Sequence, residues 1–178
     1  MDRGGGAPPT PPPRSEFFIR RREARGRTGR VESRLAFRGH FDYSLDAKNR
    51  LNIPPKFRPA FADGVVLAQW IDPCVTIWTP EGFETFTAQL LPDANPLSPE
   101  RRRVEGYFAH NSFDVTLDAA GRVTLNQDLI DYAGLGKDVI VAGTLNHLQV
   151  WDAKRWRDQQ SELAGEVVDI AESLGNAS

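Results

Sequence analysis

The sequence predicts a mainly β fold with flanking helices (α+β), in which two tandem copies of one hairpin unit interlock as a barrel. The stretch "LDAKNRLNI" at 45–53 recurs as "LDAAGRVTL" at 117–125. Apolar residues alternate around both stretches with the period of two that is typical of half-buried strands. Neither copy has enough strands to close a core alone, so we expect the copies to pair about a pseudo-twofold axis.

In the first copy, strands are expected on both sides of the charged turn, within 41–53. The runs "VVLAQW" and "CVTIW" flank "IDP" and predict a hairpin. Thr79 followed by Pro80 predicts a helix start, because threonine caps helices and proline suits the first helical position. Ser98 and Pro99 predict the start of a helix that links the copies.

The second copy repeats this order, and its runs "DVIVAG" and "HLQVW" predict another hairpin. Gly134 is expected to end a short helix before the hairpin, and Asp152 to cap the helix after it. In that last helix one apolar stripe is formed by Trp156, Leu163, Val167, Ile170 and Leu174. We expect the stripe to pack on the core or on a neighbouring subunit.

Composition and patterning divide the chain into five expected segments. The first is rich in Arg, Pro and Gly and has little to bury, so it is expected to be disordered. The segments are this extension (1–35), the first repeat (36–91), the linking helix (92–111), the second repeat (112–160) and a C-terminal helix with an acidic tail (161–178).

The 178 residues are 40% hydrophobic and 26% charged, which indicates one ordinary soluble domain or two very small ones. No apolar run reaches the roughly 18 residues of a membrane span, and the single cysteine, Cys74, can form no internal disulfide. We therefore expect a cytoplasmic protein without membrane contact. The net charge of −2 conceals an uneven distribution, because residues 1–34 hold nine Arg and four acidic residues, 35–157 hold 13 basic and 15 acidic residues, and 158–178 hold five acidic and no basic residues.

Each charged turn starts with an aspartate, Asp46 or Asp118, and an aspartate in this position can hydrogen-bond the backbone two residues on. Asn49 and Gly121 suit the left-handed backbone that a tight turn requires. We predict a structural role for all four residues.

Arg50 and Arg122 follow the two aspartates by four residues. An arginine held by a carboxylate presents an ordered fork of donors, and arginine reads phosphates and guanine edges in bidentate fashion. Both arginines alternate with core positions, so we expect them on a common face. Lys48 adds charge to the first turn, and Arg38 enters at the preceding strand. The candidate nucleic-acid contacts are therefore Arg50, Arg122, Lys48 and Arg38.

Other function classes are less well supported. A paired-carboxylate enzyme is disfavoured because Asp46 and Asp118 are followed by Ala, and each has an Arg close by that holds it ionised. The three histidines, His40, His110 and His147, lack the spacing of a metal site. We expect no enzymatic activity, metal, cofactor or small-molecule substrate. An oligomeric interaction module that does not bind DNA stays an alternative.

The chain resembles the MraZ family of bacterial transcriptional regulators in four stretches: "FRGHFDYSLDAKNRLNIPPKFR", "SFDVTLDAAGRVTLNQDL", "PERRRVEGYFAH" and "LQVWDAKRW". The signature of that family is a doubled D-x-x-x-R, which is met at Asp46 with Arg50 and at Asp118 with Arg122. The resemblance covers about residues 36–160. The first turn departs from it by having Asn49 where the family mostly has Gly.

This resemblance implies an AbrB-like (SpoVT-AbrB) swapped-hairpin barrel within one chain, so that 36–91 and 112–160 are AbrB-like repeats. It implies assembly into a homo-oligomeric ring and binding to short direct repeats in double-stranded DNA upstream of the protein's own operon. That operon is the division and cell-wall gene cluster, which the family usually represses, and the regulator is expected at the nucleoid. The implied DNA contacts are Arg50 and Arg122, with Lys48 at the basic position of the first turn.

Overall fold

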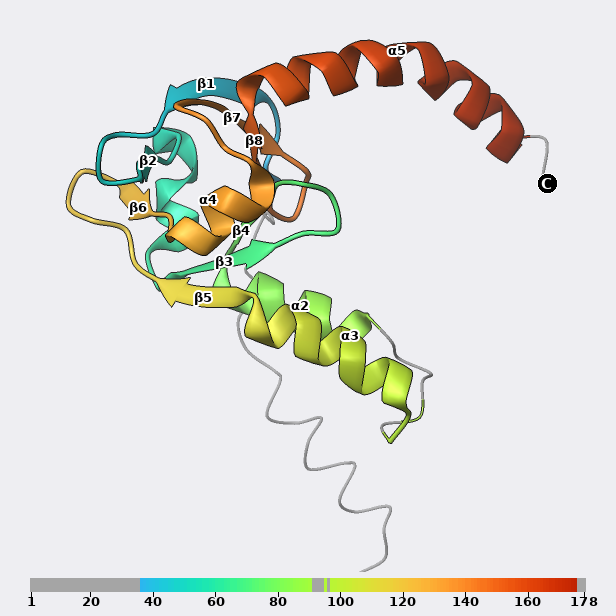
Figure 1. Ribbon diagram of the computed structural model, residues 1–178, viewed down its shortest axis with the longest axis horizontal. Coiled ribbons are helices and arrows are strands. Elements are labelled where there is room, and N and C mark those ends of the chain that lie inside the picture. Colours follow the sequence, from blue (N-terminus) through green and yellow to red (C-terminus); the bar gives the residue numbers. More distant parts are fainter. Residues whose placement is uncertain (1–35, 91–94, 96, 176–178) are drawn as a thin grey trace, which may run out of the picture. The chain divides into compact units, whose positions relative to one another are not determined.

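The structure is a computed structural model that describes residues 36–90, 95 and 97–175, with the side chains of the last helix up to residue 167. The expected extension at 1–35 lies outside the described residues. The fold is mainly antiparallel sheet with flanking helices, as the sequence predicts (Figure 1).

The elements of the two copies follow one another in the same order. The first copy contains β1 (His40–Ser44), β2 (Arg50–Asn52), the 3₁₀ helix η1 (Pro55–Phe61), β3 (Val65–Gln69), β4 (Val75–Trp78) and α2 (Pro80–Gln89). Helix α3 (Pro99–His110) follows. The second copy contains β5 (Ser112–Val115), β6 (Arg122–Thr124), α4 (Gln127–Ala133), β7 (Asp138–Gly143), β8 (Leu148–Asp152) and α5 (Ala153–Gly175).

The predicted helix boundaries are confirmed by their caps. The Thr79 side chain accepts a hydrogen bond from the Gly82 N–H at 3.0 Å, and Ser98 caps α3 in the same way. Gly134 ends α4 with φ 59°, a left-handed conformation that glycine adopts without strain. Asp152 Oδ1 accepts from the Lys154 N–H at 3.1 Å at the start of α5.

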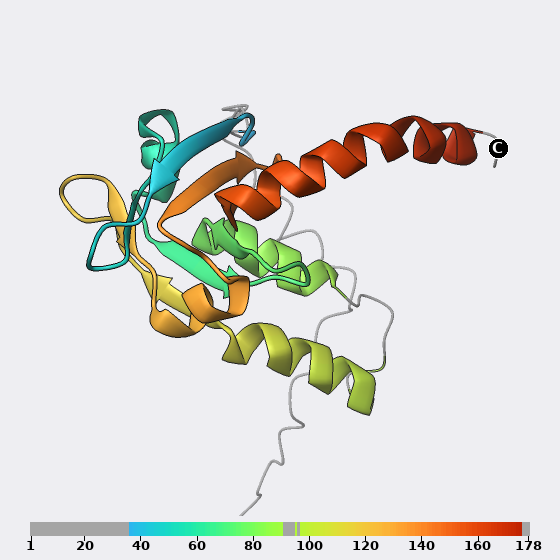
Figure 2. The ribbon, with the colours of Figure 1, turned by 45° about the horizontal axis from the view of Figure 1, so that its top comes forward.

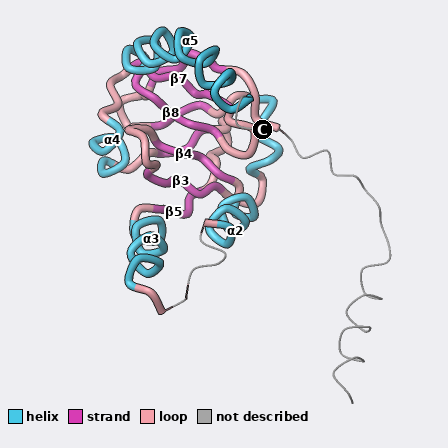
Figure 3. Tube along the Cα trace, turned by 90° about the vertical axis from the view of Figure 1, so that its right-hand side faces the viewer, coloured by secondary structure: helices cyan, strands magenta, loops and turns pink. Residues whose placement is uncertain are grey.

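Most strand pairs join one copy to the other. Six strands pair in the order β1-β7-β8-β4-β3-β5, and β2 pairs with β6 in a separate two-stranded sheet. The order is unchanged when each strand is exchanged with its equivalent in the other copy. Figure 3 shows the run from β7 to β5 side by side. The predicted interlocking of the two copies is therefore confirmed.

The strand registers locate the pseudo-twofold axis. In the two-stranded sheet, Leu51 lies opposite Val123, its own equivalent when the two charged turns are aligned. In the larger sheet, Thr76 lies opposite Gln149, its equivalent when "VTIW" at 75–78 is aligned with "LQVW" at 148–151. Both pairs are self-equivalent, so the axis passes through them. Leu51 and Val123 are fully buried, which places this axis in the hydrophobic core.

The expected single barrel is only partly realised. The ladders form one six-stranded sheet and one two-stranded sheet, and within the described ranges no ladder joins the outer strands β1 and β5. Both sheets contribute to one apolar core, to which Leu51 and Val123 come from the small sheet and Leu67 and Val141 from the large one. The core is continuous although the hydrogen-bonded ladder is not.

The prediction that the α5 stripe packs on the core is wrong for Leu163 and Val167, which lie beyond the first turns of that helix. Trp156 contacts Trp151 of β8 with ring centroids 6.1 Å apart. Leu163 and Val167 are instead 39% and 50% exposed. The side chains of Ile170 and Leu174 lie outside the described residues. The other expected partner of the stripe, a neighbouring subunit, stays a prediction.

His147 is buried in an aromatic cluster, a position that its spacing in the sequence did not indicate. Its ring stacks on Trp78 with centroids 4.0 Å apart, and Trp70 lies beside both rings. Nδ1 lies 2.8 Å from Asn146 Oδ1, whereas Nε2 has no hydrogen-bond partner. Burial lowers the pKa of His147 from 6.5 to about 4, because the charged imidazolium would lose its hydration.

This burial predicts a pH dependence of stability. A histidine whose pKa is lowered by folding favours the folded state most at pH values above its unfolded pKa of 6.5, and this contribution declines as the pH falls toward 4. We expect the free energy of unfolding to decrease by roughly 2 kcal/mol from pH 7 to pH 5. Urea titrations at both pH values test this, with His147→Leu as the control that should remove most of the difference. An equal difference in the variant would contradict the assignment.

Candidate nucleic-acid interface

The two D-x-x-x-R turns lie beside each other at one end of the fold. Figures 1 and 2 both show the loop between β1 and β2 next to the loop between β5 and β6. Backbone hydrogen bonds join each turn to the other copy: the Ile53 N–H donates to Gly121 O at 3.0 Å, and the Leu125 N–H donates to Asn49 O at 2.9 Å. The predicted adjacency of the turns is therefore confirmed.

In the first turn, the Asp46 carboxylate binds the backbone and the arginine together. Oδ1 accepts hydrogen bonds from the N–H groups of Lys48 at 2.8 Å and Arg50 at 3.0 Å. Oδ2 accepts from Arg50 Nε at 2.6 Å. One carboxylate thus fixes both the turn and the direction of the guanidinium.

The second turn repeats this geometry. Asp118 Oδ1 accepts from the N–H groups of Ala120 at 2.9 Å and Arg122 at 3.0 Å, and Oδ2 accepts from Arg122 Nε at 2.8 Å. The stapling role predicted for both aspartates agrees with these contacts.

The electrostatics of the aspartates differ from those of a catalytic carboxylate pair. The Arg50 backbone N–H, assisted by the Lys48 N–H and the Arg50 guanidinium, lowers the pKa of Asp46 from 3.8 to about 2. The corresponding contacts of Arg122 lower the pKa of Asp118. A shared proton would instead raise one of the two pKa values. Both carboxylates are ionised at neutral pH, which suits anchoring of arginines.

The two arginines meet at one carboxylate. Arg122 Nη1 lies 3.8 Å from Asp46 Oδ2, the same oxygen that accepts from Arg50 Nε. The side chains of Arg50 and Arg122 are 32% and 28% exposed, so both are ordered by contacts and still reach solvent. This arrangement presents two fixed guanidinium groups on one surface.

The third residue after each aspartate has the left-handed backbone expected from the sequence. Asn49 has φ 58° and Gly121 has φ 76°. The Asn49 side chain also donates to Gln127 Oε1 at 3.4 Å. Gly121 has a further reason to be glycine, because a Cβ atom there would overlap the guanidinium of Arg58, at 2.6 Å from its Cζ.

Comparison with known proteins agrees with this doubled site. A family model described as "MraZ protein, putative antitoxin-like" matches residues 36–105 and again residues 108–173. The chain belongs to the MraZ family. Each match contains one D-x-x-x-R turn, so the pseudo-twofold pair of turns in the fold corresponds to the two copies of the family model.

Curated relatives extend over the same region. Proteins named "Transcriptional regulator MraZ" share 36% identity with the chain in Dehalococcoides mccartyi and 34% in Lactiplantibacillus plantarum, in both cases over 78% of this chain and 97% of the relative. A protein of the same name in Lachnoclostridium phytofermentans is 29% identical over the same shares. This coverage includes both turns and nearly the whole length of each MraZ relative.

Arg58 is a basic residue of the site that the sequence prediction missed. It lies in η1, and its Nε donates to Ile53 O at 2.9 Å, beside Gly121. The sequence does contain one sign of this residue. When Asp46 is aligned with Asp118, Arg58 corresponds to Ile130, so only the first copy has a cation at this position. The contact with Gly121 could not be read from that alignment.

The remaining candidates divide into one near the turns and one away from them. Lys48 is exposed within the first turn. Arg38 lies before the start of β1, whereas the turn follows the end of this strand, so the structure does not bring Arg38 to the arginine pair. Its backbone O accepts from Lys56 Nζ at 3.3 Å.

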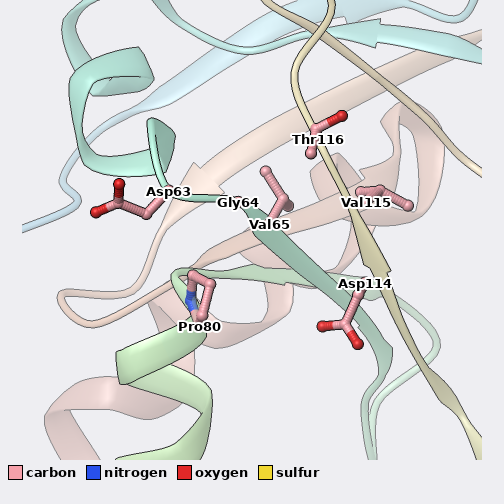
Figure 4. A pocket seen from close by; sticks show the side chains of 7 residues that line it. All are labelled: Asp63, Gly64, Val65, Pro80, Asp114, Val115 and Thr116. Carbon is pink, nitrogen blue, oxygen red and sulfur yellow. The ribbon is translucent and has the colours of Figure 1, made fainter.

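A hollow of about 350 Å³ lies where β3 and β5 meet the start of α2 (Figure 4). Its lining includes Val65, Pro80 and Val115, with the carboxylates of Asp63 and Asp114 at its margin. Two carboxylates disfavour the binding of phosphate, and neither Arg50 nor Arg122 lines this hollow.

The described ranges hold no candidate metal cluster, and the one cysteine in them is buried. No group of three or more His, Cys, Asp or Glu in these ranges is arranged to hold a metal ion. Cys74 is buried, and burial raises the pKa of its thiol above the ordinary value, which disfavours the nucleophilic thiolate. Among the residues that the structure describes, no helix is both long enough and apolar enough to cross a membrane.

The different environments of Asn49 and Gly121 predict different responses to substitution. Gly121→Ala should decrease the free energy of unfolding by about 2 kcal/mol or more, because alanine is strained at positive φ and its Cβ would displace Arg58. Asn49→Gly should change it by less than about 1 kcal/mol, since glycine adopts the same backbone. Urea titrations of both variants test this. A loss below about 1 kcal/mol in Gly121→Ala would contradict the expected strain and overlap.

Proposed function

We propose that this protein is a sequence-specific DNA-binding transcriptional regulator whose arginine pair, Arg50 and Arg122, contacts the DNA. The observation that supports this most directly is the convergence of both guanidinium groups on Asp46 Oδ2, at 2.6 Å and 3.8 Å. Arginines that are preorganised by a carboxylate lose little entropy when they bind phosphate or a guanine edge. The names of the MraZ relatives agree with a regulator.

The proposed target follows the family resemblance. We infer that the protein binds short direct repeats in double-stranded DNA upstream of its own operon and represses the division and cell-wall gene cluster. Lys48 is proposed as an additional phosphate contact because it is exposed within the first turn. Arg38 is proposed only as a peripheral contact, since it lies at the other end of β1. The protein would then be associated with the nucleoid in the cytoplasm.

Assembly into a ring is proposed for two physical reasons. The chain has a net charge of −2, so one subunit has a weak overall attraction to DNA. Several subunits that bind adjacent repeats raise the effective concentration of each later contact. The exposed Leu163 and Val167 of α5 offer apolar surface for a neighbouring subunit. Repeats separated by roughly one helical turn, about 10 base pairs, would present equivalent faces to the ring.

The arginine pair is tested by Arg50→Ala and Arg122→Ala. Specific binding should be lost, whereas the melting temperature should change little, because a partly exposed ion pair contributes only about 0–1 kcal/mol. The measurement is fluorescence anisotropy on DNA from upstream of the gene and on scrambled DNA. Arg103→Ala, on exposed α3, is the control for loss of one positive charge. Full binding by both turn variants would show that the arginine pair is not the DNA contact, whereas absence of specific binding by the wild-type protein would favour the module that does not bind DNA.

Assembly is tested separately on α5. The double variant Leu163→Asp/Val167→Asp should reduce the oligomer size seen by light scattering and weaken binding to DNA that holds several repeats. Ser161→Asp adds a charge on the opposite side of the same helix and should leave both quantities unchanged. An unchanged oligomer in the double variant would remove α5 from the proposed interface.

A further inference from the structure

The two turns have the same carboxylate geometry but different supplies of positive charge. The first turn holds Lys48, and the equivalent position of the second turn is Ala120. Arg50 and Arg122 are equivalent residues with equivalent Asp partners. From its own residues alone, the second turn therefore has one cation fewer than the first.

Arg58 lies at the turn that lacks this cation. A Cβ atom built on Gly121 would overlap Arg58 Nε and lie 2.6 Å from Cζ, so the guanidinium covers the residue that directly precedes Arg122. The equivalent of Arg58 in the second copy is Ile130, which is buried in α4. At the equivalent position of the first turn, the Asn49 side chain donates to Gln127 of the other copy, an uncharged side chain, and the additional cation is Lys48.

The contacts of Arg58 fix its position and leave its outer donors accessible. Its Nε donates to Ile53 O at 2.9 Å, and the Ile53 N–H donates to Gly121 O at 3.0 Å. The same residue thus binds both the second turn and Arg58. Among the described contacts, only Nε of this guanidinium forms a hydrogen bond, and no described carboxylate pairs with it. The side chain is half-buried, and neither Nη1 nor Nη2 is among the buried side-chain atoms that lack a partner, so both keep a route to solvent.

We propose that Arg58 is a phosphate-contacting residue of the second turn, where it replaces the cation that Lys48 supplies to the first. The inference rests on the proposed DNA-binding function. An arginine without a described carboxylate partner, fixed by a backbone oxygen next to a second guanidinium, is best neutralised by an external anion. Each turn then offers two cations, Lys48 with Arg50 and Arg58 with Arg122. Gly121 permits this arrangement because it has no side chain to displace Arg58.

The test is the salt dependence of DNA binding. Fluorescence anisotropy would be measured on a duplex from upstream of the gene and on scrambled DNA over a salt series. Arg58→Met should reduce the slope of log K against log[salt] by about one for each bound subunit and should weaken binding to both DNAs. Arg58→Lys should keep the wild-type slope. Arg103→Met, which removes a charge from exposed α3, should also keep it.

A rescue variant separates a phosphate contact from a packing role. Arg58→Met/Ala120→Lys restores a cation at the position equivalent to Lys48 and should recover the lost slope. If Arg58 serves only to cover Gly121, the slope should be unchanged in Arg58→Met, and Ala120→Lys should raise it above the wild-type value. That pattern would overturn the inference.

Stability and the wild-type result complete the test. The melting temperature of each variant shows whether it is folded, and if Arg58→Met unfolds, the comparison of Arg58→Lys with Arg58→Gln decides between charge and packing. Loss of slope in Arg58→Gln but not in Arg58→Lys supports the contact, and equal slopes in the two variants overturn it.

Absence of wild-type binding to either DNA would overturn the proposed function together with this inference. Wild-type binding with an unchanged slope in the neutral Arg58 variants would overturn the inference alone.

Discussion

The backbone exchange between the two copies is the interaction on which the site depends. The Ile53 N–H donates to Gly121 O, and the Leu125 N–H donates to Asn49 O, so each turn is held by the strand that follows the other turn. Strands β2 and β6 are three residues long and would be unstable as an isolated ribbon. Burial of their central residues in the shared core provides the missing stabilisation. The arginine pair is a consequence of this pairing.

In each turn a carboxylate fixes the position of a positively charged arginine. Asp46 and Asp118 each use one oxygen for backbone N–H groups and the other for the Nε of an arginine. Their lowered pKa values keep them ionised, so the arginines remain anchored over the neutral pH range. Each carboxylate also cancels part of the positive charge that its arginine presents at the surface. Lys48 and Arg58 lie near the turns without a described carboxylate partner, so under the proposed function they would supply much of the attraction for a polyanion.

The pseudo-twofold symmetry holds for the backbone more closely than for the side chains. Strand order and register are equivalent in the two copies, whereas Asn49 and Lys48 of one turn correspond to Gly121 and Ala120 of the other. Helix α2 packs on the aromatic cluster through Phe86, while α5 contacts strands near its start through Trp156 and Arg157. Duplication thus supplied two equivalent turns, and the elements around them became different.

The sequence by itself determined the duplication, the strands, the capped helices and the partners within each turn, because these follow from local spacing and backbone preference. It also placed both arginines on one surface, since the copies must pair. Only the tertiary structure decided that the ladder is open between β1 and β5, that Leu163 is exposed, and that His147 lies under Trp78. It likewise brought Arg58 onto Gly121 and left Arg38 away from the turns. These features depend on contacts between residues distant in the chain, and periodicity carries no information about which distant surfaces meet.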